Sequence, residues 1–275
     1  PAFAVCGHGE ALQAGVDLLR ALSDGPCYLT VRPGDQPKEF QGLHGVEMHS
    51  FAGPHPAGLV GTHIQEIRPL KAGETVWYMK AQEAMLLGPW LRSGQYPAKR
   101  VIAVGGESIA NPGYYRVREG SSLVTLTGGK PLPESVRAIS GTVLNGFAVG
   151  GTGFLGYYAT TVTAIPDGEG LRDMFGWALP QPFKLTASRA VFPWVGGRDF
   201  SVDARLNGGP RAIVNIGQWE SMTPLDIYPS FLIRAIQAND LEEALQLGLL
   251  DVTEEDLALC TVVDPSKIDL GEIVR

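Results

Sequence analysis

The chain has 275 residues, 44% of them hydrophobic, which is enough to bury a substantial core as one large or two to three small domains. Its formal net charge is −7 and it has no run of lysine or arginine, which excludes the basic surface that nucleic-acid binding needs. No stretch approaches the roughly 18 uninterrupted apolar residues of a membrane-spanning helix, so we expect a globular chain without a transmembrane segment.

The cysteines and the first residues indicate the compartment. Cys6, Cys27 and Cys260 are odd in number and far apart, which favours free thiols in a reducing compartment, the cytoplasm, over a disulfide framework. The first residues lack the basic region and cleavage site of a signal peptide. Because there is no initiator methionine and the chain runs directly into a strand-like pattern, we expect it to begin inside a domain, as a trimmed form of a longer protein.

The sequence pattern of residues 1–110 predicts a Rossmann-like α/β domain that is incomplete at its N-terminus. Apolar residues recur at helical spacing over 11–22, and residues 81–91 also read as a helix, which Gly88-Pro89 should end or kink. We expect strands at 3–6, 27–31, 46–51, 75–79 and 100–104. Strands that alternate with helices predict a parallel sheet.

From residue 111 the pattern changes to short β-prone runs separated by glycine pairs, which predicts a β-rich domain over 111–210. Its alternating runs lie at 160–165 and 184–191. Residues 211–275 read as a helical domain, with a helix over 225–236. Asp240 and Glu243 form a cap-like pair before a helix that Gly248 can end, and Thr253 with Asp256 forms a capping box. The fold class is therefore α/β followed by α+β.

The segment Phe51–Ile64 is the best functional pointer, because it packs three glycines, two prolines and two histidines into a strand-to-loop transition. Glycines permit close approach to another surface and prolines fix φ, so the loop should be rigid. His55, held between Pro54 and Pro56, would suit a residue aimed at a ligand or partner. Two histidines eight residues apart form no metal or nucleophile signature, so a purely structural loop remains the alternative.

Other candidate sites are weaker. Gly7, Gly9 and Gly15 do not fit the G-x-G-x-x-G spacing, so a plain tight turn is favoured over a dinucleotide site. The glycine turn at Val104–Glu107 could line a ligand crevice together with the 51–64 loop. All five histidines lie in the first quarter of the chain without zinc-ligand spacing, so no metal site is expected.

Several blocks in collinear order carry a family resemblance over almost the whole chain. They are the loop at 51–64 and the segments 111–123, 139–146, 222–227, 247–251 and 254–260. The chain resembles the A subunit of the sodium-translocating NADH:ubiquinone oxidoreductase (Na⁺-NQR), a bacterial respiratory complex. The resemblance implies a Rossmann-like domain, a β-grasp domain of the soluble-ligand-binding type, and a small helical C-terminal domain.

The resemblance also bears on cofactors. Related electron-transfer subunits hold iron–sulfur centres with a cysteine cluster that ends in Cys-Pro at about Cys260–Pro265. A [4Fe–4S] centre needs four thiolates, whereas Asp264 precedes Pro265 here and leaves at most one ligand. We therefore expect no redox cofactor in this chain, with flavins and the iron–sulfur centre in other subunits.

The leading hypothesis is a peripheral subunit on the cytoplasmic face of the bacterial inner membrane. The resemblance implies that it sits on membrane-embedded subunits of a respiratory sodium pump, which transfers electrons from NADH to ubiquinone with Na⁺ export. The isolated chain would scaffold rather than catalyse, and exposed aromatic residues of the β-rich domain would mark a docking surface.

Two alternatives remain open. One is a quinone-binding module, in which His55 or His63 donates a hydrogen bond to a quinone carbonyl oxygen. Its candidate residues are Gly53, Pro54, His55, Pro56, Gly58 and His63. The other is an independent NADH or flavin oxidoreductase built on the Rossmann-like half, which only the fold supports.

Overall fold

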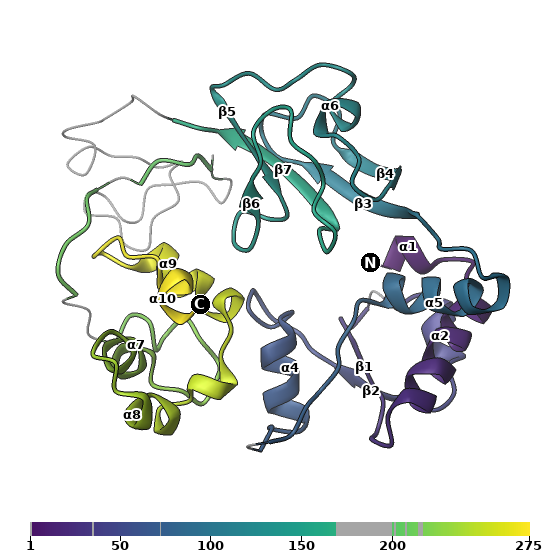
Figure 1. Ribbon diagram of the computed structural model, residues 1–275, viewed down its shortest axis with the longest axis horizontal. Coiled ribbons are helices and arrows are strands. Elements are labelled where there is room, and N and C mark those ends of the chain that lie inside the picture. Colours follow the sequence, from purple (N-terminus) through teal and green to yellow (C-terminus); the bar gives the residue numbers. More distant parts are fainter. Residues whose placement is uncertain are drawn as a thin grey trace. The chain divides into compact units, whose positions relative to one another are not determined.

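The computed structural model describes residues 2–34, 36–71, 73–168, 200, 202–206, 208–213 and 217–275 (Figure 1). These residues form two compact units. Unit 1 comprises Pro1–Arg100, Pro224–Ile227 and Gly248–Val252, and unit 2 comprises Val101–Thr223, Tyr228–Leu247 and Thr253–Arg275. The division into domains 1–110, 111–210 and 211–275 stays a prediction. No helix in the described ranges is long and apolar enough to cross a membrane.

Unit 1 contains a short parallel sheet and several helices. Its elements in chain order are α1 (Ala2–Val5), α2 (Gly9–Leu22), β1 (Tyr28–Val31), α3 (Lys38–Gln41), β2 (Glu47–Ser50), α4 (Val60–Ile67), α5 (Ala81–Ser93) and the 3-10 helix Leu249–Asp251. Strands β1 and β2 pair in parallel, with Tyr28 opposite Glu47 and Val31 opposite Ser50. The predicted parallel pairing of these two strands is confirmed.

Helices α2 and α5 approach each other closely because glycines lie at their contact. A Cβ built on Gly15 would lie 1.9 Å from the carbonyl oxygen of Ala84, and one built on Gly88 would lie 2.5 Å from the Cβ of Ala14. Only glycine allows backbones this close. The core beside this contact is made by Val5, Leu12, Val31, Phe40, Ala84 and Met85.

Two expected strands of this half of the chain are wrong, and one helix is longer than one of its two expected outcomes. Residues 3–5 belong to helix α1, since its two alanines are strong helix formers and Val5 is buried by tertiary packing. Residues 75–79 form no strand despite their β-prone sequence, because β propensity depends on a pairing partner. Helix α5 does not end at Gly88-Pro89 but continues through Pro89 to Ser93, while the alternative expectation of a kink stays a prediction. Tertiary packing against α2 accounts for the continuation of the helix.

Unit 2 is built around a five-stranded mixed sheet. Its elements are β3 (Lys99–Gly105), β4 (Gly113–Arg118), α6 (Leu123–Leu126), β5 (Val136–Ser140), β6 (Phe147–Ala148) and β7 (Thr161–Pro166). The strand order is β4-β3-β7-β5-β6, with β3 parallel to β7 and β5 antiparallel to both β7 and β6. The strand expected at 100–104 is therefore present, but it belongs to this sheet and not to that of β1 and β2.

The core of this sheet consists of Ile102, Val104, Leu123, Leu126, Ala138, Leu155 and Val162. The alternation at 160–165 correctly predicted β7, whereas the run at 184–191 lies outside the described residues.

The C-terminal helices also belong to unit 2. They are α7 (Pro229–Gln237), α8 (Leu241–Gln246), the 3-10 helix Glu254–Leu257, α9 (Ala258–Val263) and α10 (Leu270–Val274). Both predicted caps are confirmed: Asp240 Oδ1 accepts a hydrogen bond from Glu243 N at 3.0 Å, and Asp256 Oδ2 accepts one from Thr253 N at 2.9 Å. Asn145 Nδ2 donates to Glu255 Oε1 at 2.6 Å, which links the sheet's loops to the helical part. The mixed α/β fold class is confirmed.

Candidate functional site: the 51–64 loop and the start of helix α2

The loop between β2 and α4 is held by its own backbone. Phe51 N donates to Val31 O at 2.9 Å, which ties the start of the loop to β1. Within the loop, Ala57 N donates to Pro54 O at 2.9 Å and Leu59 N donates to Pro56 O at 2.8 Å. The peptide bond between His55 and Pro56 is cis. The predicted candidates Gly53, Pro54, Pro56 and Gly58 therefore lie in a turn that these backbone hydrogen bonds fold.

The two histidines of the predicted site have different environments. His63 lies on α4, half-buried, with its Nε2 2.9 Å from the carbonyl oxygen of Ala57 and its ring 4.3 Å from the ring of Phe51. The carbonyl is an acceptor, so Nε2 carries the proton in this contact. His55 is exposed and makes no hydrogen bond to the described residues.

Thr62 adds a second contact from α4, because its Oγ1 donates to Pro56 O at 3.3 Å. His63 and Thr62 thus stabilise the loop, and His55 is the exposed histidine of the loop. The glycine turn at Val104–Glu107, which the sequence suggested as the other wall of a crevice, belongs to unit 2.

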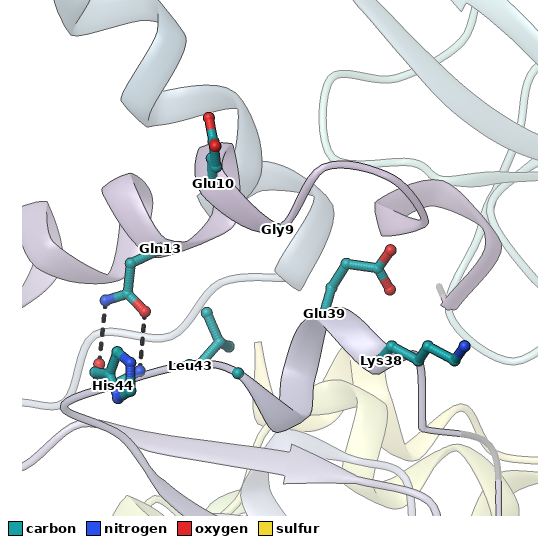
Figure 2. A pocket seen from close by; sticks show the side chains of 8 residues that line it. Gly9, Glu10, Gln13, Lys38, Glu39, Leu43 and His44 are labelled. Carbon is teal, nitrogen blue, oxygen red and sulfur yellow. Dashed lines mark hydrogen bonds between the residues drawn. The ribbon is translucent and has the colours of Figure 1, made fainter.

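A shallow depression lies where α2 begins, and sequence reasoning did not single it out. Its volume is about 270 Å³, and it is lined by Gly9, Glu10, Gln13, Lys38, Glu39, Gly42, Leu43 and His44. Figure 2 shows two hydrogen bonds that close one side of it: Gln13 Nε2 donates to His44 O at 3.2 Å, and His44 N donates to Gln13 Oε1 at 2.9 Å. No spacing rule connects Gln13 with His44, so only the fold could reveal this pair.

The turn before α2 is occupied by a carboxylate. Gly7 N donates to Glu39 Oε1 at 2.6 Å, and this hydrogen bond holds the pKa of Glu39 below its ordinary value. A phosphate at this turn would have to displace that anion, and Glu10 lines the same depression. This arrangement favours a plain tight turn over a nucleotide site.

The segment that resembles an iron–sulfur region forms a buried helix end. Cys260 is fully buried and its Sγ lies 3.5 Å from Trp219 O. Burial, with a smaller contribution from the negative charge of Glu220, raises the pKa of Cys260 to about 12, so this thiol is neutral. Asp264 is also fully buried, and its Oδ2 accepts a hydrogen bond from Ile268 N at 3.0 Å.

A neutral thiol is a poor metal ligand, and the described residues hold no group of three or more His, Cys, Asp or Glu side chains that could bind a metal ion. The residues near Cys260 therefore do not fit a [4Fe–4S] cluster. The expectation that the chain carries no redox cofactor stays a prediction.

Comparison with known proteins gives matches to family models of single domains and to individual curated proteins. Residues 1–96 match the family model described as the NqrA second alpha/beta domain, and residues 101–150 match the NQRA C-terminal domain. Among curated proteins, the A subunit of the Na(+)-translocating NADH-quinone reductase of Vibrio atlanticus is 36% identical over all of this chain and 61% of its own length. The corresponding proteins of Vibrio anguillarum and Pasteurella multocida are each 37% identical, over 98% and 100% of this chain and 60% and 61% of their own lengths.

The chain therefore spans about three-fifths of the length of the curated relatives it matches. The matched domain families agree with the mixed α/β elements of the structure. With two family models in the expected order and relatives aligned along the whole chain, the chain belongs to the NqrA family.

Proposed function

We propose that this chain is part of the NqrA component of a respiratory sodium pump that passes electrons from NADH to ubiquinone. The observation that carries the proposal is the similarity to proteins named as the A subunit of Na(+)-translocating NADH-quinone reductase, which extends over 97–100% of the chain. In this proposal the chain lies peripherally on the cytoplasmic face of the inner membrane. It contacts the membrane-embedded subunits, and the redox reactions take place on cofactors held by other subunits.

Three features of the described residues support a scaffolding role. The glycine turn that precedes α2 is occupied by the carboxylate of Glu39 and not left open for a phosphate. The Cys260 thiol is buried and neutral. The described part of the chain contains no cluster of metal-ligating side chains. These features agree with an α/β architecture that positions other subunits.

Affinity purification tests this proposal. The full chain is tagged and recovered from membranes of the cells that make it, and the NADH:quinone reductase activity of the eluate is measured. The proposal expects this activity to co-purify and to depend on Na⁺. The chain alone, released by high salt, should then show no visible absorbance of flavin or iron–sulfur groups and no heat with NADH in calorimetry.

The outcomes separate the alternatives. If a colourless chain is recovered without reductase activity, the assignment to the complex is wrong. If the released chain binds flavin stoichiometrically or NADH with measurable heat, the scaffolding role is wrong and the independent oxidoreductase is favoured.

A second candidate function is quinone binding at the 51–64 loop. The observation that favours it is the contrast between the two histidines: His63 holds the loop through Ala57 O, whereas His55 is exposed on the same hydrogen-bonded turn. An exposed imidazole on a fixed backbone can donate a hydrogen bond to a carbonyl oxygen of a quinone head group. Gly53 and Gly58 would allow the ring to approach the backbone.

A quinone titration of the full chain tests this candidate by fluorescence quenching. His55→Ala should weaken the affinity about tenfold, which corresponds to one lost hydrogen bond of about 1.4 kcal/mol. His63→Ala should weaken it as well, since the loop loses its clamp. The matched control is His8→Ala, because His8 is also exposed and lies outside the loop. Unchanged affinity in both loop variants would remove quinone from this site.

A further inference from the structure

The segment between α4 and α5 exposes four consecutive large apolar side chains. The exposed fractions are 40% for Val76, 85% for Trp77, 69% for Tyr78 and 37% for Met79. Within the described part of the chain, Trp77 is the most exposed of the large apolar side chains. Burying an aromatic side chain of this size strongly favours association, so this run is costly to leave in water.

Within the ranges that the structure describes, the backbone of Thr75–Met79 has no hydrogen-bond partner. From Thr75 to Lys80 the chain adopts neither helix nor turn. Consecutive free N–H and C=O groups on a β-prone sequence are the features of an edge strand, which templates pairing with another chain. A strand is therefore the kind of partner that satisfies both the backbone and the side chains.

The sequence of this segment is complementary to itself in one register. If two copies run antiparallel with Trp77 opposite Trp77, Thr75 lies opposite Met79 and Val76 opposite Tyr78. The Trp77–Trp77 pair is aromatic and the Val76–Tyr78 pairs join a β-branched with an aromatic side chain, and both kinds of cross-strand pair stabilise sheets. At each end, Glu74 of one copy lies opposite Lys80 of the other, so both ends carry opposite charges.

The parallel arrangement lacks this complementarity. With the two copies in parallel and in register, Glu74 would lie beside Glu74 and Lys80 beside Lys80, which is unfavourable. Charge complementarity therefore selects the antiparallel pairing, in which one surface contacts the same surface of its copy about a two-fold axis.

We propose that residues 74–80 pair with the same segment of a second copy of this chain, as antiparallel strands centred on Trp77. A single pair of short strands buries less surface than the ~1,200–2,000 Å² of stable interfaces. The dimer is therefore weak and reversible, and it forms as the concentration rises.

The decisive test reverses the charge at one end of the segment and asks whether mixing two such variants restores dimerisation. The dissociation constant of the dimer is measured by sedimentation over a range of concentrations of the full chain. Glu74→Lys alone places like charges at both ends of the dimer and should raise the dissociation constant about tenfold, and Lys80→Glu alone should do the same. When the two variants are mixed, opposite charges face each other again, so the mixture should dimerise as the wild type does. The double variant Glu74→Lys/Lys80→Glu should also dimerise normally.

This rescue separates pairing from local structure. Glu74 also accepts hydrogen bonds from Arg68 Nη2 at 2.7 Å and Lys71 N at 3.0 Å, and its substitution removes both. Loss of these contacts cannot be repaired by adding a different variant. A chain that stays monomeric at every concentration overturns the proposal, and so does a dimer that neither charge exchange nor mixing affects.

Cross-linking gives a second, independent readout. Directly opposite residues have Cβ atoms about 4.5–5.5 Å apart, close to disulfide geometry. In a background in which the exposed Cys6 is replaced by Ser, Trp77→Cys should form a covalent dimer under mild oxidation. The matched control Leu22→Cys, at a position that is 74% exposed on α2, should not. Equal cross-linking of both variants contradicts a specific register.

Discussion

In unit 1, two short parallel strands lie beside helices α2 and α5, whereas in unit 2 a five-stranded sheet carries a core to which β3, β5, β7 and α6 contribute. Two strands alone are marginal, so the first sheet depends on the helices that pack beside it. Those helices meet at Gly15 and Gly88, where no side chain fits. Close backbone approach at glycine also occurs in unit 2, where a Cβ built on Gly106 would lie 2.2 Å from the carbonyl oxygen of Ala164. The two units therefore differ in the elements that supply the buried side chains of the core, which are mostly helices in unit 1 and mostly strands in unit 2.

The largest expected effect is in unit 2. Leu123 is fully buried in its core, so Leu123→Ala should lower the free energy of unfolding of this unit by about 2–5 kcal/mol. Hydrogen exchange should show lost protection in β7 while the amides of α2 keep theirs. The control is Leu241→Ala, at a position that is 64% exposed. Equal loss of protection in both units would show that they unfold together and would break the comparison.

The second effect is in unit 1. Gly15→Ala forces a Cβ against the Ala84 carbonyl, and the resulting overpacking should cost about 1–3 kcal/mol, seen as lost protection in α2 and β1. The sign of the change in stability is informative, because alanine in a helix is otherwise about 1 kcal/mol more favourable than glycine. Gly42→Ala is the control, since nothing lies within 4 Å of the Cβ it would add. A more stable Gly15→Ala variant would mean that the α2–α5 contact is loose.

The third prediction uses the different thiols of the two units. Burial raises the pKa of Cys260 from 9.0 to about 12, so as the pH rises through this window the unfolded chain loses the thiol proton before the folded chain does. The stability of unit 2 is therefore fully retained below pH 9 and should fall by about 1 kcal/mol per pH unit between pH 9 and 12.

Comparing the wild type with Cys260→Ala isolates this effect, because all other alkaline groups are common to both. In the Cys260→Ala variant, the free energy of unfolding should lack the part of its fall between pH 9 and 12 that the thiol causes. Labelling should agree: a thiol reagent should modify the exposed Cys6 first and Cys260 only after unfolding. Rapid labelling of Cys260 in the folded chain would contradict its burial.

The smallest effect is at a helix end in unit 2. Asp240→Ala removes the hydrogen bond to Glu243 N and should cost about 1 kcal/mol of stability by thermal unfolding. Glu242→Ala, in the first turn of the same helix, is the control because its side chain makes no cap. If both substitutions cost the same, the loss reflects the charge at the helix N-terminus and not the cap itself.

The sequence predicted best those structural features that are caused by residues close by in the chain. The caps at Asp240 and at Thr253–Asp256 follow from spacing alone, and both exist. The strands at 28–31 and 47–50 lie within the β-prone runs at 27–31 and 46–51 in which they were expected. In these cases the physical cause lies within a few residues of the element that it stabilises.

Features that depend on distant residues could not be predicted. The partner of β3 is β7, about 60 residues further along the chain, so the sequence could not assign β3 to the second sheet. At the candidate site, the sequence marked the loop but could not tell that His63 is bound to Ala57 O while His55 is exposed. Nor could it show that Glu39 reaches back to the turn at Gly7.

The pair of hydrogen bonds between Gln13 and the backbone of His44 has a chemical consequence of its own. A side-chain amide that both donates to and accepts from one residue imitates a peptide group, so it ties a helix to a loop as a strand would. If Gln13 deamidates with age, the new carboxylate keeps the acceptor but places a negative oxygen against the His44 carbonyl. Slow deamidation of this amide would therefore weaken the contact between helix α2 and the loop at His44.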